Sequence, residues 1–259
     1  MSSPRILIVR APGTNCDEET AYAFKRAGGE PVVEHVNRII EDPDCLAQYQ
    51  ILCFPGGFSY GDDVAAGRIL ASQLRHQLMD VLFAFRESEK LILGICNGFQ
   101  ILLKTGLLLA DDSQRRASAT LDWNDSGRFE DRWVHLRVAS QRCIFLKNIE
   151  SMYLPVAHAE GKFVTRDNDV LGRLDSSGQL VLRYTTQDRL DAPVPYPENP
   201  NGSLVDTAGI CDTTGQVFGL MPHPERHIDP THHPQWTRQQ LGEVGDGLQV
   251  FKNAVEFFA

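Results

Sequence analysis

The sequence lacks the features that mark several large classes of protein. No apolar run approaches the ~18 residues of a membrane-spanning helix, and the first residues lead into an apolar strand at Arg5–Val9 without the longer apolar region of a signal peptide. Positive charge is scarce, since 25 Lys and Arg residues face 34 Asp and Glu residues and leave a net charge of −9. A nucleic-acid or anionic-membrane surface would need a basic patch. We therefore expect a cytoplasmic protein that binds neither nucleic acid nor membranes.

Cysteine is sparse and never closely paired. The six cysteines, at positions 16, 45, 53, 96, 143 and 211, form no C-x-x-C motif, so we expect neither a zinc site nor a thioredoxin-like motif. A chain of 259 residues is also large enough to fold without disulfides. No G-x-x-x-x-G-K-[ST] phosphate loop occurs, so this chain is not expected to bind ATP in that way. We expect no cofactor in this chain.

Apolar segments alternate with helical patterns through the first half of the chain. The expected strands are Arg5–Val9, Pro31–Val36, Gln50–Phe54 and Leu91–Ile95. The expected helices open at Asn15, which has capping-box spacing to Glu18, run as one amphipathic segment from Gly67 to Glu87, and occupy Gly98–Lys104. This alternation predicts an α/β fold with an open, mostly parallel, flavodoxin-like sheet and helices on both faces.

The second half changes to shorter strands separated by polar turns. Strands expected at Thr120–Trp123, Trp133–Val138 and Leu180–Tyr184 are interpreted as antiparallel additions to the same domain. The segment Gln187–Ser203 is rich in Pro and Asn and predicts a long loop. A strand at Val217–Leu220 and an amphipathic helix at Gly247–Phe258 then close the chain. Residues 1–259 are predicted to form a single domain, without internal repeats.

One cysteine lies where an apolar strand turns into an amphipathic helix. Cys96 follows the expected strand Leu91–Ile95 and has a glycine two residues away on each side, at Gly94 and Gly98. In a strand-to-helix elbow a nucleophile occupies strained backbone, and side chains at these flanking positions would collide. The helix start near Asn97 offers backbone N–H groups and a dipole that favour a thiolate and can stabilise an oxyanion. The alternative is a buried cysteine between two turn glycines.

A histidine and a glutamate near the end of the chain could serve such a cysteine. His223 and Glu225 are two residues apart after the strand-like run 216–218, and prolines flank His223 on both sides. In extended backbone, residues two apart point to the same side, so the imidazole and the carboxylate can meet. A nucleophilic cysteine needs a base, and the base needs a group that fixes its tautomer. His158 and Glu160 form a second His-x-Glu pair and are rivals for these roles.

Three further histidines, His227, His232 and His233, cluster just after this pair. Carboxylates that could complete a metal site are sparse nearby, and the histidine spacing does not support a particular metal site. We therefore interpret them as solvated loop histidines and expect no metal in this chain.

Three segments together resemble the triad-type glutamine amidotransferases. They are GICNGFQ at 94–100, PGGFSYGD at 55–62 and GLMPHPER at 219–226. Three more segments make the chain similar, within that group, to the glutaminase subunits of phosphoribosylformylglycinamidine synthases. They are PGTNCD at 12–17, AHAEGKF at 157–163 and NPNGS at 199–203. The resemblance spans nearly the whole chain.

The resemblance implies a reaction and roles for particular residues. Cys96 would attack the side-chain amide of L-glutamine, His223 would act as acid and then as base, and Glu225 would orient the imidazole. Backbone N–H groups of Gly57 and Asn97 would hold the oxyanion. The resemblance also implies a large synthetase subunit that receives the ammonia and uses ATP and magnesium to amidate phosphoribosylformylglycinamide. In this family a small accessory subunit often joins the complex.

Three other functions remain open from the sequence. A triad amidotransferase of another pathway is disfavoured by the GFSYGD and NPNGS segments. A stand-alone cysteine amidase or hydrolase would be fully active without a partner and would show little preference for glutamine. A regulatory subunit that only senses glutamine would not need Cys96, His223 and Glu225, which are all present.

Overall fold

The computed structural model describes residues 3–109, 117–188, 193–239 and 242–259. Its strands are β1 (Arg5–Arg10), β2 (Glu30–His35), β3 (Ile51–Phe54), β4 (Leu91–Ile95), β5 (Ala119–Trp123), β6 (Glu130–Val138), β7 (Ser151–His158), β8 (Glu160–Thr165), β9 (Leu182–Thr185), β10 (Thr207–Cys211) and β11 (Val217–Leu220). Its α-helices are α1 (Asp17–Arg26), α2 (Val36–Glu41), α3 (Arg68–Gln77), α4 (Met79–Glu87), α5 (Asn97–Thr105), α6 (Asn168–Ser176) and α7 (Leu248–Glu256). No α-helix in these ranges is both long enough and apolar enough to cross a membrane.

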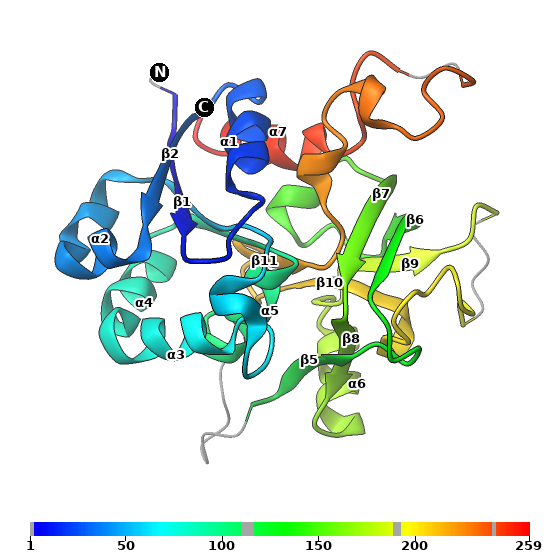
Figure 1. Ribbon diagram of the computed structural model, residues 1–259, viewed down its shortest axis with the longest axis horizontal. Helices are drawn as coiled ribbons and strands as arrows, with labels where there is room; N and C mark the ends of the chain where they lie inside the picture. The colour runs from blue at the N-terminus through cyan, green and yellow to red at the C-terminus, as the bar shows by residue number, and fades with distance from the viewer. Residues whose placement is uncertain (1–2, 110–116, 189–192, 240–241) are drawn as a thin grey trace.

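Nine strands form one sheet in the order β2-β1-β3-β4-β11-β10-β9-β6-β7 (Figure 1). The first five are parallel, and their order along the chain is that of a flavodoxin-like sheet. Phe54 at the end of β3 is level with Gly94 in β4, and Leu220 at the end of β11 is level with Ile95. The loops that follow β3, β4 and β11 therefore meet at one edge of the sheet. The predicted α/β fold class is confirmed.

The remaining sheet strands are antiparallel, as expected, but one predicted strand lies elsewhere. β5, which covers the predicted strand Thr120–Trp123, pairs with β8 in a separate two-stranded sheet. The sequence patterns also missed β7, whose pairing with β6 includes Pro155 opposite Trp133. Proline within an apolar run argues against a central strand, but it is tolerated here because β7 is the edge strand of the sheet.

Helices cover both faces of the parallel strands. α1 and α7 lie together on one side, where the rings of Phe24 and Phe251 meet edge to face at 4.9 Å, and α3, α4 and α5 lie on the other side (Figure 1). Two predicted details were wrong. Asn15 does not cap α1, which starts after Cys16 and has no side-chain cap. The expected helix 67–87 is broken at Leu78, where φ is −130° and the side chain stays buried in the core.

Both halves of the chain share one hydrophobic core. A continuous cluster of buried apolar side chains extends from Ile6 in β1 through Phe99 in α5 to Leu154 in β7 and Phe251 in α7. This continuity favours the single-domain interpretation. The predicted loop Gln187–Ser203 is partly outside the described residues. Its last part is tied down, because Asn201 donates to the carbonyl of Gly161 at 2.8 Å.

Candidate active site

The strand-to-helix elbow predicted at Cys96 is present between β4 and α5. Cys96 has φ 50° and ψ −105°, a left-handed conformation that side chains rarely adopt. A Cβ atom on Gly94 would lie 2.6 Å from the carbonyl oxygen of Gly98. A Cβ atom on Gly98 would lie 1.8 Å from the carbonyl oxygen of Phe54 in the neighbouring strand. Both glycines are therefore sterically required, the second because α5 packs directly against the end of β3.

The side chain of Cys96 opens on a cavity instead of facing bulk solvent. Its exposed fraction is only 5%, although the residue lies at an elbow. The elbow turns the thiol toward β7, where Sγ lies 3.7 Å from the carbonyl oxygen of Ala157. Together with Gly57, Gln100 and His158, Cys96 lines a cavity of about 390 Å³. A ligand of modest size can therefore reach the sulfur through this cavity.

His223 and Glu225 meet as predicted, although by a different backbone route. The imidazole Nδ1 lies 2.6 Å from Glu225 Oε1, and both side chains are almost fully buried. The chain is not extended here, because residues Pro224–Arg226 form a 3-10 turn that follows His223. The backbone N–H of His223 donates to the carbonyl of Pro155 at 2.9 Å, which anchors this turn to β7.

The buried pair favours a charged imidazole. Burial by itself would lower the pKa of His223, but the Glu225 carboxylate and then negative charge on the Cys96 sulfur outweigh it, and the pKa is raised well above the ordinary value. His223 Nε2 has no hydrogen-bond partner among the described residues. A histidine with one nitrogen on a carboxylate and the other unpartnered has the arrangement expected of an acid–base catalyst.

A second cysteine lies beside this pair, and the sequence analysis did not single it out. Cys16 precedes α1, and its Sγ, a ring nitrogen of His223 and a carboxylate oxygen of Glu225 all lie within 4.8 Å of one another. Burial raises the pKa of the Cys16 thiol to about 11, against a smaller opposing effect of the nearby His223 imidazole. Only the PGTNCD segment hinted at it, as a point of family resemblance and without a role.

Cys16, His223 and Glu225 are the one group of close metal-type donors in the part of the chain that the structure describes. Thiol ligands bind metal as thiolates, and a thiol with a pKa near 11 gives up its proton reluctantly. The Glu225 oxygen is already bonded to His223, and Arg226 donates to the sulfur of Cys16 at 3.2 Å. The geometry therefore favours a hydrogen-bonded cluster.

The rival pair His158 and Glu160 is not a dyad. His158 Nδ1 lies 3.1 Å from Asn124 Oδ1, and the Glu160 carboxylate accepts from the N–H of Ala66 at 3.2 Å. Asn124 Nδ2 donates to two carbonyls, so its Oδ1 must accept and His158 Nδ1 must carry the proton. Burial lowers the pKa of His158 to about 3, so this imidazole is neutral. Both residues line the cavity that Cys96 faces, but neither supports the other as a base.

The backbone N–H groups predicted to hold an oxyanion both lack acceptors. Neither the N–H of Gly57 nor that of Asn97, the first residue of α5, has a hydrogen-bond acceptor among the described residues. Gly57 has φ 138°, a conformation that favours glycine. The side chain of Asn97 accepts from the N–H of Ser59 at 3.3 Å and donates to Asp62 at 3.2 Å. This links the loop after β3 to the helix that carries the nucleophile.

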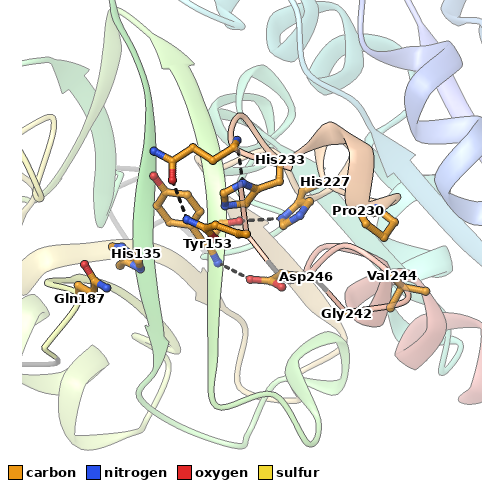
Figure 2. Close-up of a pocket in the computed structure, with 11 residues that line it drawn as sticks. His135, Tyr153, Gln187, His227, Pro230, His233, Gly242, Val244 and Asp246 are labelled. Atoms are coloured by element: carbon orange, nitrogen blue, oxygen red, sulfur yellow. Dashed lines mark hydrogen bonds between the residues drawn. The ribbon is translucent and has the colours of Figure 1, made fainter. Parts of the chain in front are cut away.

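The histidines after the pair are packed, so their interpretation as solvated residues was wrong for two of the three. His227 and His233 are buried, and His232 is exposed. His227 Nδ1 lies 2.9 Å from the carbonyl oxygen of Tyr153, and the ring of His233 packs 5.5 Å from that of Tyr153. Figure 2 shows His227 and His233 beside Tyr153 at a cavity of about 410 Å³. These contacts pack the loop against β7.

Comparisons with known proteins show the family of the chain. A family model described as a CobB/CobQ-like glutamine amidotransferase domain matches residues 3–258. Phosphoribosylformylglycinamidine synthase subunit PurQ of Dehalococcoides mccartyi is 48% identical over 260 residues, which cover 99% of this chain and 98% of that protein. The same subunit of Methanococcus maripaludis is 42% identical, covering 98% of this chain and 97% of that protein.

A solved structure with related sequence has the same fold. The chain matches a chain in the structure of PurLQS from Thermotoga maritima with a TM-score of 0.75 and 32% identity, covering 99% of this chain and 100% of that chain. Sequence and fold therefore agree over the whole length. This chain belongs to the PurQ family, the glutamine amidotransferase subunits of phosphoribosylformylglycinamidine synthase.

Proposed function

We propose that this chain hydrolyses the side-chain amide of L-glutamine through a thioester on Cys96 and delivers the ammonia to a large synthetase subunit. That subunit uses the ammonia and ATP to convert phosphoribosylformylglycinamide to phosphoribosylformylglycinamidine, a step of purine biosynthesis. The observation that carries the proposal is the buried contact of 2.6 Å between His223 and Glu225, coupled electrostatically to a cysteine at a strained elbow.

In the first half of the reaction, the Cys96 thiolate attacks the amide carbon and forms a C–S bond. The C–N bond then breaks while the His223 imidazolium transfers its proton to the leaving nitrogen, so that ammonia departs. Glu225 stabilises the imidazolium before this transfer. In the second half, neutral His223 takes a proton from water, the water oxygen attacks the thioester, and glutamate leaves as the Cys96 sulfur is released.

The oxyanion formed in both halves is assigned to the backbone N–H groups of Gly57 and Asn97. Support comes from their lack of other acceptors and from the hydrogen bonds that link their two segments. Loss of one such donor costs on the order of a hundredfold in turnover in a comparable acyl-transfer site. The Gly56–Gly57 peptide is held through its carbonyl oxygen, which accepts from the N–H of Cys16 at 3.3 Å.

The assigned chemistry needs only a thiol, an imidazole, a carboxylate and backbone donors. The chain therefore acts without a cofactor or metal of its own. It acts as one catalytic domain, in the cytoplasm. ATP and magnesium are bound by the synthetase subunit, and a small accessory subunit completes the assembly.

The test is glutaminase activity of the wild-type chain and Cys96→Ser, each with and without the synthetase. Cys96→Ser should fold normally and release no ammonia from glutamine, and the synthetase should raise wild-type turnover because uncoupled hydrolysis wastes glutamine. Full turnover by the isolated chain, unchanged by the synthetase, would favour a stand-alone cysteine hydrolase instead. Activity retained in Cys96→Ser would overturn the nucleophile.

A further inference from the structure

Arg226 follows Glu225 directly in the sequence, yet its guanidinium is bonded elsewhere. Its Nε donates to Glu19 Oε1 in α1 at 2.8 Å, and its Nη2 donates to the sulfur of Cys16 at 3.2 Å. Cys16 in turn lies between this guanidinium and the His223–Glu225 pair, because its sulfur is within 4.8 Å of both partners. The Cys16 sulfur thus contacts the Arg226 guanidinium and lies close to the Glu225 carboxylate, to which Arg226 is not hydrogen-bonded.

The carboxylate has an oxygen to offer. Glu225 Oε1 is bonded to His223, but Oε2 is fully buried and has no hydrogen-bond partner among the described residues. A buried, unpaired carboxylate oxygen is unfavourable, and a guanidinium is the group best shaped to satisfy it. An arginine at this distance that bonds instead to Glu19 and Cys16 therefore needs an explanation.

We propose that Glu19 is a positioning residue which, with Cys16, holds Arg226 away from Glu225, so that the carboxylate acts on His223 alone. The inference rests on the proposed function, in which the His223 imidazolium donates the proton to ammonia. If Arg226 paired with Glu225, its positive charge would offset that of the carboxylate, and the imidazolium would lose much of its stabilisation.

The other ionisable groups around the pair do not replace Glu19 in this role. They are Cys96 at the elbow, Cys16 before α1, Cys53 in β3 and His158 in β7. The thiols of Cys53 and Cys16 have raised pKa values, chiefly through burial, and His158 is neutral, so none of these three offers Arg226 a negative charge. Among the residues that the structure describes, Glu19 is the carboxylate outside the pair that bonds to the guanidinium.

The test compares Glu19→Gln with Glu18→Gln, its neighbour in α1. Glu18 is exposed and pairs with Arg10, so its replacement provides a matched loss of charge on the same helix. Glu19→Gln should lower glutaminase kcat about tenfold and move the alkaline limb of the pH profile to lower pH, because the imidazolium then loses its proton more readily. Glu18→Gln should leave kcat and the profile within about twofold of wild type.

The decisive variant is Glu19→Gln combined with Arg226→Met. If Glu19 acts only through Arg226, its replacement has no further effect once the guanidinium is removed. The double variant should therefore match Arg226→Met in kcat and in the alkaline limb of the pH profile. Glu19→Asp, whose shorter side chain weakens the contact, should give an intermediate shift and carries the test if Glu19→Gln does not fold.

Equal profiles for Glu19→Gln and Glu18→Gln, or a double variant slower than Arg226→Met, would overturn the inference. So would a Glu19→Asp profile identical to that of the wild type when Glu19→Gln is unfolded. These results are distinguishable from failure of the proposed function, which would appear as activity retained in Cys96→Ser.

Discussion

Replacing Gly98 with alanine would test the packing that shapes the elbow. A Cβ atom at this position would lie 1.8 Å from the carbonyl oxygen of Phe54 and 2.6 Å from its carbonyl carbon. Neither atom belongs to a flexible side chain, since both are backbone atoms at the end of β3. The helix α5 must therefore move away from β3 by more than 1 Å, roughly, before the contact reaches an ordinary van der Waals distance.

The size of the effect follows from this forced displacement. Overpacking of a rigid core typically costs about 1–3 kcal/mol, which lowers Tm by roughly 2–12 °C in a chain of this size. Catalysis should suffer more than stability, because α5 carries both Cys96 and Asn97. A misplacement near 1 Å in a catalytic group can reduce turnover about a hundredfold. We expect Gly98→Ala to fold with a lowered Tm and to lose about that much glutaminase activity.

Gly172→Ala is the matched control. Gly172 lies within α6, and a Cβ atom there would have no neighbour within 4 Å. Alanine should raise stability by about 0.5–1 kcal/mol, because glycine is unfavourable inside a helix, and should leave turnover unchanged. Thermal unfolding and ammonia release would be measured on both variants. Wild-type Tm and turnover in Gly98→Ala would refute the steric account of the elbow.

The remaining predictions concern the ionisable groups of the site. His223→Ala should reduce turnover by at least about a thousandfold, close to the loss in Cys96→Ala, because triad members act as a unit, and His158→Ala should lose less; a larger loss at His158 in the same steady-state assay would reverse the assignment of the base. The pKa of His158 is about 3 in the folded protein, well below its value in the unfolded chain. Below the unfolded pKa, the unfolded chain binds a proton at His158 that the folded protein does not bind, so the free energy of unfolding decreases as pH falls. His158→Gln should therefore remove about 2 kcal/mol of the wild-type loss in unfolding free energy between roughly pH 7 and pH 5, as measured by denaturant titration, and an unchanged pH slope would contradict the buried, neutral state. Iodoacetamide should label Cys96 before Cys16, which is buried and has a pKa near 11; peptide mapping that finds Cys16 first would contradict these environments.

Local spacing in the sequence was sufficient for two local features of the site, the elbow at Cys96 and the contact between His223 and Glu225. Gly94, Cys96 and Gly98 lie within five residues, and the elbow that they form depends on backbone torsions and close packing at that point. His223 and Glu225 are two residues apart, so their contact was predicted correctly even though the backbone between them forms a 3-10 turn and is not extended. The alternation of apolar strands and amphipathic helices likewise predicted the parallel sheet, because burial of each element leaves its own periodic pattern.

Contacts between distant segments were decided only by the tertiary structure. Cys16 and Arg226 are 210 residues apart and meet because α1 and the turn after β11 share one edge of the sheet. The choice between the two His-x-Glu pairs depended on Asn124 in another loop, which hydrogen-bonds to His158 Nδ1 in place of Glu160. β7 was hidden by Pro155, which is acceptable only because β7 is an edge strand. A sequence pattern reports the burial and the backbone conformation of each segment. Contacts between residues far apart in the chain depend on how the folded segments pack together.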